Sequence, residues 1–329
     1  MLNKSPFFVR LLHWEYWPAY ITQIPVLLFW LVAALKTRRA GFFAIVNPAI
    51  ETGGLFGESK INILEKIPPK FLPKTLFIHQ ENKEMDFILA QLRSNGIHFP
   101  IILKPNVGER GLAVEKIEDE TYLKSHIQKV NYDFIIQSYL YEPLELSVLC
   151  YKLPLKKKYA ITSICEKEFL HIIGDDVSTF GELVRNKPRA LLQQKALYAK
   201  YKPQWQEAIP DGKKLYIQPI GNHSRGTKFL NANHQIDEQL TQLFISILDE
   251  MEGIHYGRFD LRTESWEALR NGQFKVMEFN GVGSEPAHIY HPGYSIIQAY
   301  KDIWQHWRIM QAIYWEQRRL GYEGMTLRE

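Results

Sequence analysis

Apolar and polar residues follow two different periods along this chain, and each period predicts a type of secondary structure. Alternation with a period of two predicts strands at 256–261 and 274–280, joined by a hairpin connection that ends at Asn271 and Gly272. Apolar residues at helical spacing predict a helix at 236–252. Further strands are expected near 75–78, 100–104, 133–139 and 146–151, and further helices near 61–66, 85–95 and 118–129, with a short helix opening at the capping-box spacing of Thr179 and Glu182.

The composition is that of a globular protein. With 329 residues the chain can bury a large core and hold more than one structural lobe. The succession of strands and helices predicts an α+β or α/β body. The net charge is +4 and no extended basic stripe is interleaved with aromatic residues, so we expect no nucleic-acid partner. Cys150 and Cys165 have no metal-ligand spacing and are expected to be small apolar residues in a reducing compartment.

The N-terminal segment departs from this composition. Residues 16–35 carry no charge, and their number is close to the ~20 that a membrane span requires. Tryptophans and tyrosines crowd the start of this run, as is typical of membrane interfaces: Trp14, Tyr16, Trp17 and Tyr20. The segment therefore fits a membrane-associated element, or else a buried helix of a soluble domain.

Charge and prolines constrain how such a segment would meet a membrane. Pro18 and Pro25 interrupt the run, and basic residues flank it on both sides, at Lys4 and Arg10 and at 36–39. Because lysine and arginine preferentially stay cytoplasmic, we expect a re-entrant or monotopic insertion rather than a full crossing. The body of the protein would then face the cytosol, at the cytoplasmic face of a bacterial inner membrane.

The two C-terminal strands carry the most informative polar residues. Side chains alternate faces along a strand, so Glu278 and Asn280 point the same way, and by the same rule Arg258 and Asp260 share a face. By the same rule Met277 and Phe279 are expected to point into a core. Three oxygen ligands (Asp260, Glu278 and Asn280) beside one guanidinium suit Mg²⁺ bridging phosphates, since Mg²⁺ keeps few protein ligands. The alternative is a ribbon whose outer face is only solvated.

Phosphate-binding residues are expected earlier in the chain. No Walker loop and no glycine fingerprint of a dinucleotide site occurs. Lys104 instead ends an expected strand, and Gly108 and Gly111 follow it in a loop whose backbone amides can approach phosphates. A flexible turn between two strands accounts for these residues equally well.

A candidate adenosine site follows about thirty residues later, in the stretch IIQSYLYEPLELSV. Adenine can pair with the backbone and with the amide of Gln137 near Leu140, and the carboxylate of Glu145 can accept both ribose hydroxyls. Glu145 could instead be an exposed residue at the start of a strand.

Taken in order, these segments resemble the ATP-grasp superfamily, and most closely its D-alanine–D-alanine ligase-like branch. The matching stretches cover about residues 60–300 and occur in family order: GESK, PIILKPNVGERG, IIQSYLYEPLELSV, GDDVSTFGEL, GNHSRGTK, and GRFDLR paired with FKVMEFNG. Each stretch alone is weak, whereas six in order are specific.

The resemblance implies an α+β ATP-grasp fold, with two lobes that clasp ATP, preceded by a hydrophobic helical segment. It implies that Lys60 and Lys104 bind the ATP phosphates under the 105–111 loop. It also implies that Gln137, Leu140 and Glu145 contact adenosine. Asp260, Glu278 and Asn280 would be ligands of Mg²⁺ or Mn²⁺. Arg258 would stabilise the acyl-phosphate and the tetrahedral species. Arg225 and Lys228 in the 222–228 loop are expected to help, or else to form a basic surface turn.

The implied activity is that of an ATP-dependent carboxylate–amine or carboxylate–thiol ligase of the EC 6.3 type. Its carboxylate substrate would be a small molecule or lipid-linked, and an amine would be the acceptor. His288, Tyr290 and His291 are candidates for lining the acceptor pocket, although a lone histidine is more often structural. A phosphotransferase on the same fold and a non-catalytic nucleotide-sensing membrane module are the alternatives.

The chain also departs from the family pattern. Only 59 residues precede Lys60, so the usual first domain has no counterpart, and the stretch after Asn280 differs from the D-alanine ligase pattern. We therefore expect four segments: a membrane-associated segment (1–40), a linker with the first lobe (41–140), a second lobe with the metal site (141–308) and a helical tail (309–329).

Overall fold

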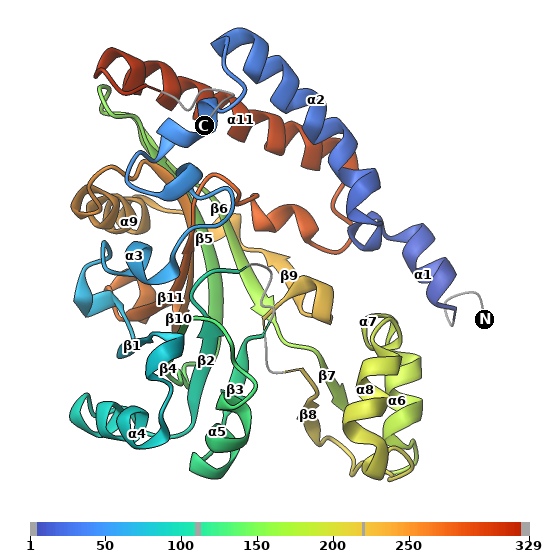
Figure 1. The fold of residues 1–329 in the computed structure, drawn as a ribbon. Coiled ribbons are helices and arrows are strands. Elements are labelled where there is room, and N and C mark those ends of the chain that lie inside the picture. Colours follow the sequence, from blue (N-terminus) through green and yellow to red (C-terminus); the bar gives the residue numbers. More distant parts are fainter. Residues whose placement is uncertain (1–4, 109–112, 219–220, 324–329) are drawn as a thin grey trace.

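The computed structural model describes residues 5–108, 113–218 and 221–323, which form an α+β fold (Figure 1). The helices are α1 (Pro6–Leu12), α2 (Ala19–Thr37), α3 (Lys60–Leu64), α4 (Met85–Ser94), α5 (Glu120–Ile127), α6 (Phe180–Asn186), α7 (Pro188–Leu191), α8 (Gln194–Tyr201), α9 (Glu238–Glu250), α10 (Trp266–Arg270) and α11 (Ile296–Arg319). The strands are β1 (Thr75–Ile78), β2 (Ile101–Pro105), β3 (Glu115–Ile117), β4 (Phe134–Ser138), β5 (Leu144–Lys152), β6 (Tyr159–Glu168), β7 (His171–Ile173), β8 (Lys214–Tyr216), β9 (Lys228–Asn231), β10 (Tyr256–Thr263) and β11 (Phe274–Asn280).

The first lobe is a small antiparallel sheet in the order β1-β4-β2-β3, covered by α4 and α5. The two helices bury their apolar faces, represented by Ile88 and Leu123, against Ile101 and Leu103 of β2. This sheet holds Lys104 near the end of β2, beside β4. The last strand of this sheet in chain order, β4, ends at Ser138.

The second lobe is an antiparallel sheet in the order β11-β10-β5-β6-β9. On one face, Leu146 and Val148 of β5 and Phe259 of β10 pack against α9, which contributes Phe244 and Leu248. Because side chains alternate, the residues between them point to the opposite face. That opposite face carries the polar residues discussed below.

A third, smaller unit projects from the second lobe (Figure 1). It consists of the β7–β8 ribbon and the helices α6, α7 and α8, and it has its own core around Phe180, Leu197 and Trp205. Its first helix begins with the expected capping box of Thr179 and Glu182.

The N-terminal segment lies along the outside of the second lobe (Figure 1). Helix α2 packs on α11, and the α1–α2 connection contacts the loops that follow β11. Pro18 caps the start of α2, and Pro25 lies inside it without ending it. Of the described helices, α2 is the one whose length and apolar composition would suffice to cross a membrane, and only 11% of that window is buried.

Three features differ from the sequence-based expectations. Strand β6, in the middle of the second sheet, was not expected, because charged residues interrupt its apolar pattern. The connection between β10 and β11 contains the short helix α10 rather than a simple turn. Helix α11 continues without a break through residue 308, so the expected boundary of a C-terminal tail at 309 does not coincide with the end of an element.

Candidate active site

The β10–β11 ribbon brings the proposed metal ligands together. Asp260 is paired directly with Glu278 in the register, and Arg258 with Asn280. Asn280 Nδ2 lies 3.2 Å from Asp260 Oδ2. Arg258 donates to both carboxylate oxygens of Asp260, from Nε at 3.2 Å and from Nη2 at 3.3 Å. The four residues therefore form one contiguous polar patch.

A β-bulge lies next to this patch and corrects one expectation. Asp260 pairs with Glu278 and the next residue, Leu261, pairs with Val276, so Met277 is left as the extra residue. The bulge reverses the alternation: Val276 and Phe279 are buried in the core, whereas Met277 is only half-buried. The expectation that Met277 points into the core was wrong, and the expectation for Phe279 was correct.

A buried charge network extends from Asp260 across the sheet. We define it as Glu145, Lys167, Arg258, Asp260 and Arg262. The Asp260 carboxylate accepts a hydrogen bond from the Ser147 hydroxyl and lies 3.6 Å from Lys167 Nζ. Burial alone would raise the pKa of Asp260, but Arg258 and Lys167 outweigh burial and lower the pKa to about 2. Asp260 is therefore held ionised, which a cation ligand requires.

Glu145 forms the other end of the network. Its two oxygens accept hydrogen bonds from Lys167 Nζ at 3.2 Å and from Arg262 Nε at 3.0 Å. The residue is only 5% exposed, so the alternative of an exposed strand-start residue is wrong. Gly221 lies directly against this carboxylate, because a Cβ added there would meet Glu145 Oε1 at 2.1 Å.

Lys167 and Arg262 are site residues that the sequence reasoning missed. Lys167 lies on β6, a strand that was not expected, and it bridges Glu145 and Asp260. Although burial opposes it, the neighbouring Asp260 and Glu145 raise the pKa of Lys167, so this side chain stays charged. Arg262 follows Arg258 and Asp260 in two-residue steps along β10, and that spacing was a signal that could have identified it.

Lys104 reaches the metal-ligand ribbon from the first lobe. Its ammonium nitrogen donates a hydrogen bond of 2.8 Å to the carbonyl oxygen of Met277, and the residue is 6% exposed. Burial is the main cause that lowers the pKa of Lys104 to about 8, while the nearby Glu278 acts in the opposite direction. An anionic ligand at this point would restore the ordinary pKa by supplying opposite charge.

Lys60 joins this group from α3. Its ammonium donates to the carbonyl oxygen of Gly108, and its backbone amide donates to the Asn106 carbonyl at 3.0 Å. Gly108 has a φ of 142°, which only glycine adopts readily. Lys60, Lys104 and the beginning of the 105–111 loop are thus adjacent, whereas Gly111 lies outside the described residues.

The candidate adenosine residues lie where the two sheets meet. Gln137 is buried on β4 and donates from Nε2 to Thr75 Oγ1 at 3.1 Å. The Leu140 carbonyl accepts a hydrogen bond of 2.8 Å from Arg262 Nη1. Through Arg262 the connection between the lobes is therefore tied to Glu145 and the buried charge network.

The remaining expected residues occupy the edge of the second sheet. Lys228 lies on β9 with Nζ 3.5 Å from Glu168, its partner in the register, and Arg225 lies in the preceding 3₁₀ turn. His291 Nδ1 accepts the amide proton of Asn231, which fixes the end of β9. These contacts give Lys228 and His291 structural partners at the sheet edge.

His288 and Tyr290 differ in their surroundings. His288 is buried, with Nδ1 2.8 Å from Ser163 Oγ and Nε2 3.3 Å from Asp302 of α11, which is a structural role. Tyr290 is half-buried and donates to Glu285 Oε2 at 2.6 Å. Arg258 Nη1 donates to the backbone carbonyl of the same Glu285 at 3.3 Å. Tyr290 and Arg258 therefore contact the same residue.

The N-terminal segment borders this end of the site. Trp14 donates to the Tyr294 carbonyl at 2.6 Å, and its ring lies 5.7 Å from that of Tyr290. Gln23 of α2 donates to Glu285 Oε1 at 3.1 Å. The N-terminal segment therefore touches the loop beside Arg258.

An ion pair fixes the same segment to the third unit. The Glu15 carboxylate is buried and accepts from Arg189 Nη2 at 2.8 Å, with His223 Nε2 at 3.8 Å from its second oxygen. Burial alone would raise the pKa of Glu15, but His223 and Arg189 lower it on balance. The sequence reasoning did not identify Glu15 or Arg189.

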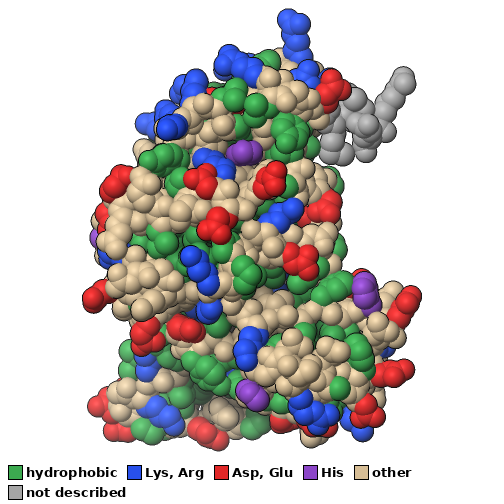
Figure 2. Space-filling model, turned by 90° about the vertical axis from the view of Figure 1, so that its left-hand side faces the viewer, with side chains coloured by type: hydrophobic (Ala, Val, Ile, Leu, Met, Phe, Trp, Pro, Cys, Tyr) green, Lys and Arg blue, Asp and Glu red, His purple; other side chains and the backbone are tan. Residues whose placement is uncertain are grey.

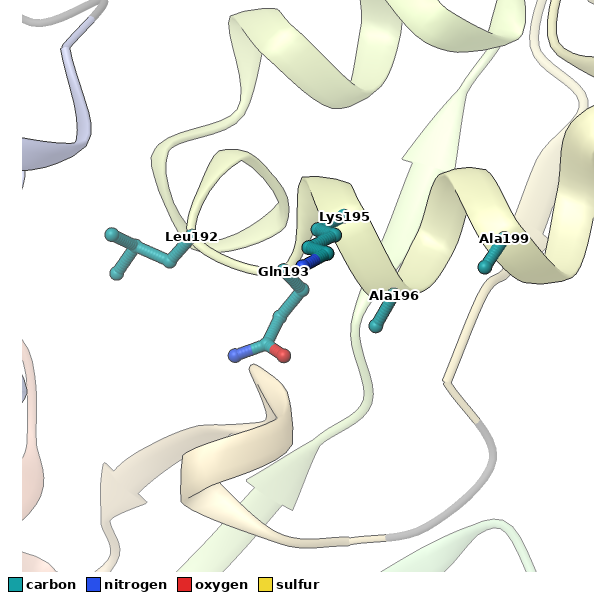
Figure 3. Close-up of a pocket in the computed structure, with 5 residues that line it drawn as sticks. All are labelled: Leu192, Gln193, Lys195, Ala196 and Ala199. Atoms are coloured by element: carbon teal, nitrogen blue, oxygen red, sulfur yellow. The ribbon is translucent and has the colours of Figure 1, made fainter.

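Two hollows in the described structure lie outside the charge network. One, of about 420 Å³, lies along α8 and is lined by Leu192, Gln193, Lys195, Ala196 and Ala199 (Figure 3). In this view Gln193 points from the start of α8 toward the 223–225 turn, where its Nε2 donates to the Ser224 carbonyl at 2.7 Å. The other hollow lies near α10. Neither is lined by a residue of the network.

The donor set of the β10–β11 ribbon fits Mg²⁺ better than a transition metal. In the described part of the chain no group of three His, Cys, Asp or Glu residues has the arrangement of a metal site. The ribbon instead offers two carboxylates and one amide on one face, all of them hard oxygen donors. Such a set is too small to enclose a cation alone and leaves positions for phosphate and water.

Comparisons with known proteins found similar solved structures. No family model and no curated protein matches the chain. It is similar to the structure of D-alanine–D-alanine ligase from Bacillus anthracis, at 14% identity and a TM-score of 0.44, over 82% of this chain and 70% of that one. It is also similar to the VanG D-Ala:D-Ser ligase from Enterococcus faecalis, at 12% identity and a TM-score of 0.45, over 78% of this chain and 61% of that one.

A bifunctional glutathione synthetase from Pasteurella multocida is similar at 15% identity and a TM-score of 0.39, over 71% of this chain. The chain spans 34% of the length of that enzyme and 61% of the length of the VanG ligase. At these identities and TM-scores, the function has to be argued from the residues of this chain.

Proposed function

We propose that this protein is an ATP-dependent ligase of the ATP-grasp type, which joins a carboxylate to an amine or a thiol. The observation that carries the proposal is the convergence of two lobes: Lys104 of the first lobe contacts the ribbon that presents Asp260, Glu278 and Asn280. Cations that face a set of oxygen ligands across a lobe boundary suit a polyphosphate with its metal.

Nucleotide binding in this proposal follows from the positions of the lysines. Lys60 and Lys104 neutralise the phosphates, and the loop that begins at Pro105 covers them. Gln137 and the backbone near Leu140 hold adenine at the connection between the lobes. Glu145 holds the ribose, and to do so one of its oxygens exchanges its Lys167 or Arg262 hydrogen bond for a ribose hydroxyl.

Mg²⁺ would be held by Asp260, Glu278 and Asn280, and Mn²⁺ would fit the same oxygen donors. When bound, the cation neutralises charge on the phosphate oxygens. For Asn280 to act as a ligand, its amide must turn its oxygen toward the cation. A rotation of the amide group about its last side-chain bond is sufficient.

The residues of the chain supply positioning and charge in the reaction. The substrate carboxylate attacks the γ-phosphorus of ATP, the bond to ADP breaks, and an acyl-phosphate forms. The amine then attacks the acyl carbon, and phosphate leaves. Arg258 lies beside Asp260 with Nη1 on the Glu285 carbonyl, and it stabilises the anionic oxygen of the tetrahedral species.

We place this activity at the cytoplasmic face of a membrane. The support is that α2, an apolar helix, is connected to the site by Trp14 and Gln23. A carboxylate that is lipid-linked, or a small molecule delivered at the membrane, would reach Arg258 and Glu285 past these residues. The membrane in this proposal is the bacterial inner membrane, whose cytoplasmic face meets cytosolic ATP.

The test is a screen of ATP turnover by the full chain across amino acids and lipid-linked carboxylates, each with an amine acceptor. A ligase releases ADP and free phosphate in step with an amide product. A phosphotransferase on the same fold would leave a stable phosphoester, and a nucleotide-sensing module would bind ATP without turnover. Either result, obtained across the screen, would replace the ligase proposal.

A further inference from the structure

Helix α2 packs along one face onto α11 for most of its length. Near its start, the Tyr300 hydroxyl donates to the Thr22 carbonyl at 3.2 Å. In the middle, the ring of Phe29 lies 5.0 Å from that of Trp304. At its end, the Tyr314 hydroxyl donates to the Thr37 carbonyl at 3.2 Å. The contact face therefore extends over four turns.

The opposite face of α2 is an exposed apolar stripe. Apart from the adjacent Leu27 and Leu28, its residues recur at steps of three or four, which places them on one side of the helix. Their exposed fractions range from 46% to 75%, and no described part of the chain covers them. We call these residues the α2 stripe: Tyr20, Ile24, Leu27, Leu28, Leu31 and Leu35.

A basic cluster adjoins the end of this stripe. Figure 2 shows lysine and arginine side chains gathered at the upper end of the molecule. There the end of α2 meets the end of α11 through Thr37 and Tyr314, and α11 meets the β5–β6 turn, where Leu155 donates to Glu316. The end of α2 carries Lys36, Arg38 and Arg39, the end of α11 carries Arg318 and Arg319, and the β5–β6 turn carries the lysines at 156–158.

The packing partner of α2 is incompatible with a crossing. Helix α11 exposes a polar stripe of Lys301, Gln305 and Arg308 at helical spacing. A bilayer around α2 would draw this stripe into hydrocarbon, where each charged side chain is costly. Separating the helices would instead expose the faces that hold Phe29 and Trp304 together.

We propose that α2 lies in the plane of an anionic bilayer surface, with the α2 stripe inserted at the headgroup boundary and the basic cluster on the headgroups. An apolar face next to clustered lysine and arginine is the pattern of interfacial helices, and charge complementarity selects an anionic lipid surface as the occupant. The inference rests on the proposed membrane location and specifies its form: one leaflet, no crossing.

The first experiment is co-sedimentation of the full chain with vesicles of phosphatidylcholine, with and without phosphatidylglycerol. Binding is expected with phosphatidylglycerol and is expected to weaken as salt is raised. Leu27→Glu and Leu31→Glu should each lower the partition coefficient about tenfold. Val177→Glu is the matched control, because Val177 is 81% exposed in the third unit, and it should leave binding unchanged.

The second experiment determines the topology in inverted membrane vesicles, with a cleavable tag at each end of the chain. In-plane binding leaves both tags open to added protease on the same side, whereas a crossing protects one of them. A protected tag overturns the in-plane form and keeps the membrane location. Absence of vesicle binding overturns both the in-plane form and the membrane location. A dimer in solution that Leu27→Glu and Leu31→Glu dissociate also overturns both, because a second copy of the chain then covers the α2 stripe. Loss of ATP turnover affects neither result.

Discussion

The ammonium nitrogen of Lys104 lies 2.8 Å from the carbonyl oxygen of Met277 and thereby joins the two lobes at the bulge beside Glu278. The contact has a specific chemical setting, since burial lowers the pKa of Lys104 to about 8. A buried ammonium with one carbonyl partner is poorly compensated, and such a group is ready to accept an anion. We therefore expect Lys104 to bind a phosphate of ATP.

Replacing Lys104 with Met should separate stability from function. The change removes a buried charge that costs folding free energy, so the melting temperature should stay the same or rise. ATP affinity should fall at least about tenfold, because the phosphates lose a direct cation. Calorimetry of unfolding and of ATP binding measures both effects. Reduced stability with unchanged ATP affinity would assign Lys104 a purely structural role. Lys116→Met, on the neighbouring strand β3, is the control.

Replacing Lys167 with Met should destabilise the protein strongly. Lys167 compensates the charges of two buried carboxylates, Glu145 and Asp260. Without Lys167, these two carboxylates lose their shared cation. Breaking a buried ion pair on one side costs roughly 3–5 kcal/mol. The double variant with Glu145→Gln should recover part of that loss, and denaturant unfolding of both variants measures the coupling. Independent, additive effects would show that the buried charge network is not a unit.

Replacing Arg189 with Met tests how the N-terminal segment is held. The change removes the guanidinium partner of the buried Glu15 carboxylate, at a cost of about 3 kcal/mol. The α1–α2 connection should then be cut faster in limited proteolysis, and the KM of the substrate bound near Tyr290 should rise more than kcat falls. Arg185→Met, at an exposed position of α6, is the matched control. Equal cleavage rates in both variants would contradict the role of the ion pair.

The buried histidines predict how stability depends on pH. Burial lowers the pKa of His306 from 6.5 to about 4. Between pH 6.5 and pH 4 the unfolded chain therefore binds a proton that the folded chain excludes, and stability falls as the pH is lowered through this window. The shift corresponds to roughly 3 kcal/mol. In unfolding measurements, His306→Gln should make the free energy of unfolding less dependent on pH between pH 4 and 6.5. His234→Gln, at an exposed position, should leave this dependence unchanged. An equal pH dependence of the free energy of unfolding in both variants would contradict the assignment of this effect to His306.

The sequence predicted the elements whose pattern is local. Strands β1 and β11 have the expected bounds, and the capping box at Thr179 and the helix that became α9 were also correct. The face shared by Arg258 and Asp260 followed from alternation alone. These features depend on neighbours in the chain, so a single sequence contains them.

What depends on distant partners was not predictable in this way. The bulge at Met277 reverses alternation through pairing with β10, and nothing in the local pattern marks it. Lys167 interrupts an apolar run, and only the pairing of β6 with β5 shows that Glu145 and Asp260 compensate it. The docking of Glu15 on Arg189 joins positions 174 residues apart. Roles of individual residues in ATP, Mg²⁺ and substrate binding stay predictions.

The most direct test of the central claim is Mg²⁺-dependent ATP turnover in Glu278→Gln, compared with Glu264→Gln at the exposed end of the same ribbon. Both variants remove one carboxylate charge, but only the first removes a proposed metal ligand. We predict that Glu278→Gln lowers turnover about a hundredfold or more and raises the Mg²⁺ concentration needed for half-maximal activity, while Glu264→Gln behaves as the unmodified chain. Equal turnover and equal Mg²⁺ dependence in the two variants would contradict the account.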